Sequence, residues 1–309
     1  MSIDTFKRGL VAGLMSLDLH EAAYPVLAPR YTWYRGTTHR GTFTTIRLLD
    51  SYEPADISTV TESWAADENM TGSIMCYVEG TVLTIAGNGS GKIMANPDSS
   101  YLFGGDIYYE NFVTAANIAG LDVIDTSNVT NMHGMFYQCK SLASVSLSSF
   151  DTSNVTDMAY MFSGCNALTS LNLSNFDTSN VTSMRCMFFG CKPLTSLDLS
   201  SFDTSNVTNM AAVFSGCNAL TSVNLSSFDT SNVTDMNSMF SDCNALTSLD
   251  LTSFDTCNVT DMGLMFYQCT AITAIIVGDG WSTESVTTSM LMFGGKCGVS
   301  KVTHVSATT

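Results

Sequence analysis

Apolar and polar positions recur along most of the chain with a fixed period of 26 residues. The hexapeptide Asp-Thr-Ser-Asn-Val-Thr opens each unit, the last time with Cys257 in place of Ser. It begins at Asp125, Asp151, Asp177, Asp203, Asp229 and Asp255. A fixed period in this range is the signature of a solenoid, in which each unit buries its apolar side only by stacking on neighbours. The six repeats account for about half of the chain.

The first half of each unit has the apolar spacing of a helix. In the unit that opens at Asp151, Met158, Phe162 and Cys165 follow one another three or four positions apart. This spacing predicts a short helix or helical turn. Asn154 precedes it as a candidate N-cap, a residue type whose side chain satisfies free amide donors at a helix start. The opening aspartates are expected to accept hydrogen bonds from local turn amides.

The second half of the unit has the period of a strand. Leu168, Leu171 and Leu173 are separated by outward polar residues, and alternation of this kind is typical of a half-buried strand. Each unit therefore predicts helix, turn and short parallel strand. The fold class is an α/β repeat solenoid, a leucine-rich-repeat-like right-handed array with a small β-rich N-terminal region.

Degenerate copies of the repeat place the ends of the array. Residues 101–105 echo the Met-Phe-x-Gly-Cys segment, and Val286 to Phe293 repeats the Val-to-Phe spacing of seven found in each unit. The solenoid therefore spans 101–298 and is followed by a tail over 299–309. Residues 25–100 are expected to form a β-rich cap. Within it, two β-branched strands flank a Glu79-Gly80 turn, and the polar stretch 53–71 is expected to be loop. Residues 1–24 are a candidate helical docking or oligomerisation segment.

Charge excludes several classes of partner. Twelve Lys and Arg against 28 Asp and Glu give a formal charge of −16, which repels phosphate backbones and anionic membranes. Nucleic acid is therefore not an expected partner. No apolar run reaches the length of about 18 residues that membrane insertion needs.

The sequence contains no recognisable catalytic, metal or cofactor motif. Its four histidines lie far apart, and no HExxH, GxSxG or CxxC motif occurs. Residues 86–92 resemble a phosphate loop, but Ala86 replaces its first Gly and Ile93 its Ser or Thr, so a glycine turn is expected. Cysteines recur every 26 residues on the apolar side, where they are expected to pack as free thiols. We therefore expect no enzyme, no cofactor and no metal.

The units LTSLDLSSFDTSNVTNM and MFSGCNALTSLNLSNFDTSNVTDM resemble the BspA-like leucine-rich repeat surface proteins, over residues 101–297. The resemblance implies extracellular display, adhesion to a cell-surface protein or glycan, and no enzymatic activity. A convincing export signal and a wall anchor are not visible, which departs from that pattern. Repeats of this type also occur in phage virion proteins. The alternative is therefore a structural virion protein that docks on other virion proteins through residues 1–24 and displays the array for host attachment.

Function is expected at positions that differ from one unit to the next, because the invariant positions serve packing and turns. One candidate surface is the middle outward position of the strand, which is polar or acidic. It comprises Ser146, Asn172, Asp198, Asn224 and Asp250. The other lies on the face predicted as helical, where aromatic residues and Arg replace small residues, as in binding hot spots. It comprises Tyr137, Tyr160, Arg185, Phe189 and Tyr267.

Overall fold

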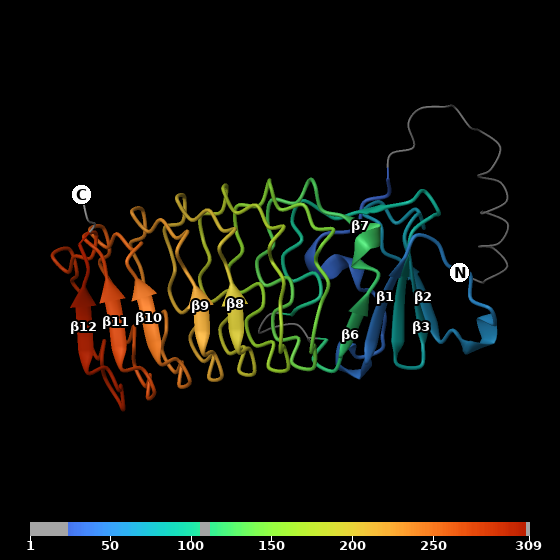
Figure 1. Ribbon diagram of the computed structural model, residues 1–309. Coiled ribbons are helices and arrows are strands. Elements are labelled where there is room, and N and C mark those ends of the chain that lie inside the picture. The colour runs from blue at the N-terminus through green and yellow to red at the C-terminus, as the bar shows by residue number, and fades with distance from the viewer. Residues whose placement is uncertain (1–23, 106–111, 307–309) are drawn as a thin grey trace.

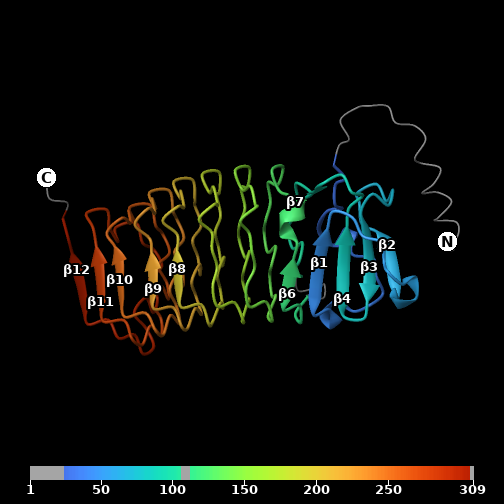
Figure 2. The same cartoon turned by 45° about the vertical axis from the view of Figure 1, so that its right-hand side comes forward.

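The computed structural model describes residues 24–105 and 112–306 as an elongated molecule (Figure 1). A mixed sheet forms the N-terminal end, and a long stack of chain turns continues from it toward the C-terminus. Figure 2 shows the strands of this stack along one side, pointing the same way. The predicted helix over residues 1–24 lies outside the described residues except for Tyr24.

The N-terminal sheet has the strand order β2-β3-β4-β1-β6. Its strands are β1 (Thr45–Leu49), β2 (Glu62–Ala65), β3 (Met75–Glu79), β4 (Val82–Ala86) and β6 (Asn117–Ala119). β3 and β4 form an antiparallel hairpin around Gly80, whose φ is 59°, which confirms the predicted turn. β1 pairs in parallel with both β4 and β6, so the sheet leads directly into the array.

Two further features of this region differ from a plain strand pattern. Residues 53–71, expected to be loop, contain the edge strand β2, which pairs with β3 although its sequence ESWA has no apolar alternation. A strand held by backbone pairing at an edge leaves little hydrophobic signal in its sequence. Short 3-10 turns complete the framework: η2 (Arg30–Trp33), η3 (Arg40–Thr42), η4 (Ile57–Thr59) and η5 (Leu121–Val123).

Aromatic side chains close the N-terminal end of the solenoid core. Trp33, Phe43 and Phe112 are completely buried, and the rings of Trp33 and Phe112 stack with centroids 5.9 Å apart. The indole Nε1 of Trp33 donates a hydrogen bond to the Leu102 carbonyl at 3.2 Å. The Arg40 guanidinium lies over this cluster. The first turns of the array are therefore covered by a packed aromatic layer.

Parallel pairing between successive turns of the chain forms several short ladders, on more than one side of the array. They join β5 (Ile93–Met94) to β7 (Ile124–Asp125), β8 (Ser196–Asp198) to β9 (Ser222–Asn224), and β10 (Ser248–Leu251) to β11 (Ala274–Val277) and β12 (Lys301–His304). Ser196 pairs with Ser222, a register of one repeat. β12 extends this pairing into residues expected to form the tail.

The predicted helix of each unit is absent, which corrects the fold class: the array consists of short parallel strands and turns. Amides alternate between two kinds of partner. Those of Tyr160 and Phe162 donate to carbonyls of the next rung at 2.8 and 2.9 Å, whereas that of Ser163 donates back to Tyr160 at 3.0 Å. Tyr160 and Gly164 have φ of 59° and 77°, and left-handed residues this close together cannot occur in an α-helix.

Rung spacing gives the physical reason for this correction. Side by side, α-helices need about 8–10 Å between axes, whereas paired strands need about 4.8 Å. The stacked Phe rings of the array have centroids 5.4 to 6.0 Å apart. This ladder comprises Phe103, Phe136, Phe162, Phe188, Phe214, Phe240, Phe266 and Phe293. A straight stack at this spacing has no room for a helix on every rung. Successive turns produce the same three- and four-residue spacing of apolar residues that a helix would produce.

Polar side chains of the hexapeptide join each rung to the next. The buried Thr152 hydroxyl donates to the Asp177 carbonyl and accepts from the Asp177 amide, both at 2.8 Å. Asn154 does not cap a helix, because its Nδ2 donates to the Ser127 carbonyl of the preceding rung at 2.8 Å. Asp151 Oδ1 accepts from the Ser153 amide at 3.0 Å, as predicted for a turn. The repeated hexapeptide is therefore structural.

Candidate binding surfaces

The polar strip predicted on the strand side is exposed along its whole length, from Ser146 to Asp250. Four of its members accept a hydrogen bond through Oδ1 from the backbone amide two residues on, at 3.0 to 3.2 Å. They are Asn172, Asp198, Asn224 and Asp250. These positions require a side-chain oxygen that accepts a hydrogen bond from a turn amide, and both Asn and Asp supply one. A binding role for this strip stays a prediction.

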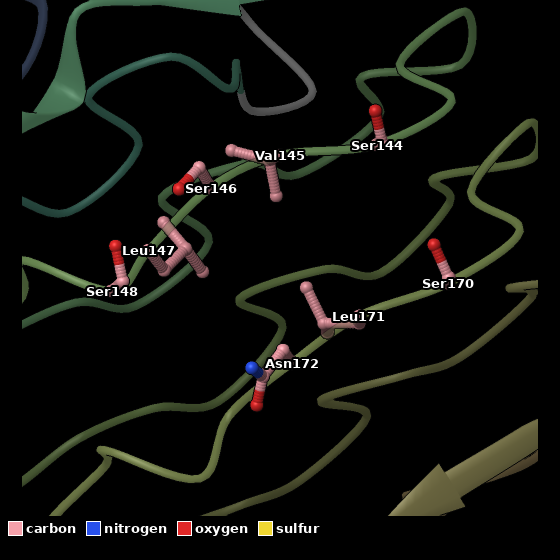
Figure 3. A pocket seen from close by; sticks show the side chains of 8 residues that line it. All are labelled: Ser144, Val145, Ser146, Leu147, Ser148, Ser170, Leu171 and Asn172. Atoms are coloured by element: carbon pink, nitrogen blue, oxygen red, sulfur yellow. The ribbon is translucent and has the colours of Figure 1, made fainter.

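A hollow of about 430 Å³ opens on the same side, between residues 144–148 and 170–172 (Figure 3). In Figure 3 the side chains of Leu147 and Leu171 extend into the space between the two segments. Ser146 belongs to the first segment and Asn172 to the second. Neither segment forms a strand, although the corresponding segments β8 and β9 of later rungs pair. No charged side chain lines this hollow, so it offers little for specific recognition.

The turn edge carries a denser group of side chains, which we call the aromatic cluster: Tyr101, His133, Tyr137 and Tyr160. The ring centroid of Tyr137 lies 5.8 Å from that of Tyr101 and 6.1 Å from that of Tyr160. His133 lies 5.3 Å from Tyr160 by the same measure, and its Nε2 is 3.1 Å from the Tyr101 hydroxyl. His133 Nδ1 is 3.1 Å from an Asp157 carboxylate oxygen, which fixes the ring.

The sequence predicted two members of this cluster and missed the other two. Tyr101 belongs to the degenerate rung that precedes the first full unit, outside the regular numbering of the repeat. The available signal is Gly134, which occupies the rung position of Tyr160. A Cβ there would lie 2.5 Å from the Tyr101 ring, so the glycine makes room for that ring to reach His133.

The third rung extends the aromatic cluster but the sixth does not. Arg185 and Phe189 are exposed on the third rung, with 44% of the Phe189 side chain accessible. Burial raises the pKa of Tyr160, and the positive charge of Arg185 opposes that rise. Tyr267 lies three repeats beyond Phe189 in the numbering, so the structure does not bring it together with the other aromatic candidates.

Two lysines that the sequence reasoning missed lie on the same edge. Lys140 and Lys192 are exposed and follow Tyr137 and Phe189 by three residues. Together with Arg185 they are the whole complement of Lys and Arg between residues 112 and 278, a segment with thirteen Asp. The signal was available, because the second, fourth and fifth units have Asn at this position, typified by Asn166. Every Lys and Arg between residues 112 and 278, which we call the array cations, therefore lies on the rungs that carry the aromatic cluster and Phe189.

The ladder cysteines are structural. All described cysteines are free, which confirms the prediction of unpaired thiols. Each ladder Sγ lies 2.9 to 3.4 Å from a Phe carbonyl of the preceding rung and donates to it. Burial raises the pKa of Cys139, Cys217 and Cys269 to about 12, so these thiols are poor nucleophiles. Among the described residues no group of three or more His, Cys, Asp or Glu is placed to hold a metal ion.

The glycine-rich segment after β4 is held by carboxylate and carbonyl groups of the protein. The Gly91 amide donates to Asp50 Oδ1 at 2.7 Å, and Lys92 Nζ donates to the Asp122 carbonyl. Donors that a phosphate would need are thus already used. Within the described parts of the chain, no helix has the length and apolarity to cross a membrane.

Fold and surface together define a repeat protein built on a Phe ladder. The chain belongs to the family described as "Mycoplasma protein of unknown function, DUF285", whose pattern matches residues 107–196 and 187–304. The two matches cover the array and exclude most of the N-terminal sheet. No curated protein and no solved structure matches the chain. The family description gives no function, so function has to be argued from the surface.

Proposed function

We propose that the protein is a non-enzymatic recognition module that binds an acidic glycan at a cell surface. The observation that carries this proposal is that the array cations, which are the only Lys and Arg between residues 112 and 278, lie on the same rungs as the aromatic cluster and Phe189, in a segment with thirteen Asp. Aromatic rings offer flat apolar faces with polar tips, which suit the mixed surface of a sugar. Lys and Arg supply the charge that an acidic group on that sugar requires.

The placing of the cations favours a polymer with repeated charges. Lys140 and Lys192 lie on the first and third rungs, with Asn166 between them on the second. Two rungs correspond to about 10 Å along the array at a strand spacing of about 4.8 Å. Charges at regular intervals along an extended polysaccharide can meet both lysines, with the Tyr137 and Phe189 rings beside them. The surrounding aspartates repel anions that do not match this arrangement.

The proposal includes the resemblance to BspA-like surface proteins. Surface display puts the array where a glycan is accessible, and recognition of a glycan requires no catalytic group. Display on a virion would present the same surface, and labelling of intact cells against mass spectrometry of purified particles distinguishes the two locations. The predicted role of residues 1–24 in such docking stays a prediction.

The test is binding of the full chain to immobilised polysaccharides. Polygalacturonate and heparin serve as carboxylated and sulfated probes, and dextran as the uncharged one. We expect binding to at least one anionic probe that weakens as salt increases. Tyr137→Ala and the double change Lys140→Glu, Lys192→Glu should each weaken it by about tenfold or more, the size expected for a hot spot.

The matched control is Tyr267→Ala, which removes the same side chain from the same rung position outside the cluster. It should leave binding unchanged. Equal loss with Tyr267→Ala, or binding to dextran as tight as to both anionic probes, contradicts the proposal. Binding to intact cells that survives enzymatic removal of acidic glycans would point instead to a protein ligand.

A further inference from the structure

The two ends of the solenoid core differ in how they are covered. At the N-terminal end the first rungs lie under the aromatic layer of Trp33, Phe43 and Phe112. At the C-terminal end, side chains at inward positions are exposed. Phe293 continues the Phe ladder yet is 47% exposed, whereas Phe266 on the preceding rung is completely buried. The last rung therefore presents the cross-section of the core to solvent.

The strand side shows the same loss of cover. Val302 of β12 pairs with Ile275 of β11, and Ile275 is 1% exposed while Val302 is 50% exposed. β12 is the last strand of its sheet in the described part of the chain, so one of its edges carries backbone groups without a strand partner. Such an edge is a template for a further strand.

A hollow opens at the same end of the array. It has a volume of about 480 Å³ and is lined by Met262, Thr283, Val286, Ser289, Met292 and Phe293. Met290 and Val305, which are 73% and 49% exposed, add to the uncovered apolar surface. Several uncovered apolar side chains on one rung favour an interaction surface, whereas single exposed apolar residues do not.

Charge distinguishes this end from the rest of the array. Residues 279–306 contain Asp279 and Glu284 against Lys296 and Lys301, so they are balanced. Residues 112–278 contain thirteen Asp against three cations. Two copies that approach side by side bring acidic surfaces together, whereas two copies that meet at their C-terminal ends do not.

We propose that the C-terminal end of the array is a self-association interface, through which two copies of this chain join end to end. Each copy contributes the same surface: the free edge of β12 and the uncovered side chains of Phe293 and Val302. Because the surface pairs with itself about a two-fold axis, assembly closes at the dimer. Head-to-tail stacking would need a matching open apolar cross-section at the other end. There the aromatic layer covers the core, and the edge strand β2 carries the charged Glu62 and no apolar alternation.

Dimerisation also has a consequence for the ligand surface. The aromatic cluster lies on the rungs nearest the N-terminal sheet, far along the array from β12 (Figure 2). An end-to-end dimer therefore carries two such surfaces, well separated along one long particle. Multivalent display of this kind raises the apparent affinity for a repetitive ligand without any new contact. The dimer itself does not depend on the proposed ligand.

The test is the mass of the full chain in solution, measured by sedimentation velocity over a range of concentrations from low to high micromolar. We expect a reversible monomer–dimer equilibrium. Val302→Lys should shift the midpoint of that equilibrium at least tenfold toward monomer. Ile57→Lys is the matched control, because Ile57 is also 50% exposed but lies in η4 of the N-terminal region. It should leave the midpoint unchanged.

A second measurement separates loss of the interface from loss of the last rung. Amide hydrogen exchange over residues 299–305 should slow as protein concentration increases for the wild type, and should not do so for Val302→Lys. A chain that is monomeric throughout the range overturns the proposal, as do open-ended oligomers larger than a dimer. A dimer that Val302→Lys leaves intact also overturns it, whatever the melting temperature of the variant.

Discussion

The N-terminal region and the array hold their cores by different means. In the N-terminal region, hydrogen bonds join residues far apart in the chain, such as the Trp33 indole with Leu102 and the Thr114 hydroxyl with Phe43. In the array, almost every bond between rungs joins residues about one repeat apart, as from Thr152 to Asp177. We therefore expect the N-terminal region to unfold as one cooperative unit, and the stability of the array to be a sum of contacts between neighbouring rungs.

This difference teaches where sequence variation is tolerated. In the array each ladder position has a fixed requirement, which the repeat states six times, and variable positions between the ladders are free to acquire side chains. The aromatic cluster and the array cations occupy such positions. In the N-terminal region no repetition isolates a free position, because most of its aromatic residues contact one another. A recognition surface can therefore change in the array at little cost in stability.

The largest expected effect is a charge placed in the array core. Leu199 is buried at an inward position of the third unit, so Leu199→Asp buries a carboxylate with apolar neighbours at the aligned positions Leu173 and Leu225. We expect a loss of at least about 3 kcal/mol, comparable with or above the removal of a core leucine, and unfolding from the centre of the array.

The adjacent outward change is its control. Asp198→Asn keeps the Oδ1 acceptor that bonds the Ser200 amide at 3.0 Å, as Asn172 does on the neighbouring rung. Its melting temperature should match that of the wild type. Equal melting temperatures for Leu199→Asp and Asp198→Asn would mean that the inward and outward sides of the strand are assigned wrongly.

Removing one aromatic ring from each region sharpens the comparison. Phe188 stacks between Phe162 and Phe214 at 6.0 and 5.9 Å, and Trp33 is buried in the aromatic layer. Phe188→Ala and Trp33→Ala should each cost about 3–5 kcal/mol. Hydrogen exchange should show faster exchange confined to rungs near Phe188 in the first variant, and across the whole N-terminal sheet in the second. If exchange became faster along the whole array in Phe188→Ala, the nearest-neighbour description of the array would be wrong.

Most features of the array could be predicted from the sequence, but the helix in each unit could not. The period, the inward leucines, the free buried thiols and the β3–β4 hairpin are all confirmed, because each depends on local residue pattern. The helix was wrong, because spacings such as Met158 to Phe162 to Cys165 arise from successive turns as well as from a helix. Rung spacing, a property of the stack and not of one unit, decides between them.

The candidate site was predicted less completely for a similar reason. Tyr137 and Tyr160 stood out against small residues at the same rung positions. Tyr101 and His133 did not stand out, because Tyr101 lies on a rung outside the regular numbering. Its ring reaches His133 through the space that Gly134 leaves open. Lys140 and Lys192 stand out only when their repeat position is compared with the same position of other units, three of which have Asn there. Grouping on a surface depends on which rungs are neighbours and on which positions face outward.

A smaller effect should follow from loss of one polar ladder contact. Thr152→Val keeps the shape of the side chain but leaves the amide and carbonyl of Asp177 without the buried hydroxyl that bonds both. We expect a loss of about 1–3 kcal/mol, the cost of unsatisfied buried polar groups. Thr156→Val is the matched control, because the Thr156 hydroxyl bonds the Thr130 carbonyl on the exposed surface. Chemical denaturation of both variants measures the difference, and equal stabilities would show that the Thr ladder is not required.

The smallest effect concerns acid. The pKa values of Asp151, Asp177 and Asp203 are lowered, chiefly by hydrogen bonds from the side chain of the Ser two residues on. A lowered pKa in the folded state stabilises the fold above the ordinary Asp pKa of about 3.9, and this contribution is lost as the pH falls through the lower folded value. The triple variant Asp151→Asn, Asp177→Asn, Asp203→Asn keeps the Oδ1 acceptors and removes the titration. Its melting temperature should therefore fall less steeply than that of the wild type below about pH 4, with parallel curves above. Parallel curves below pH 4 as well would show that these turns do not couple folding to protonation.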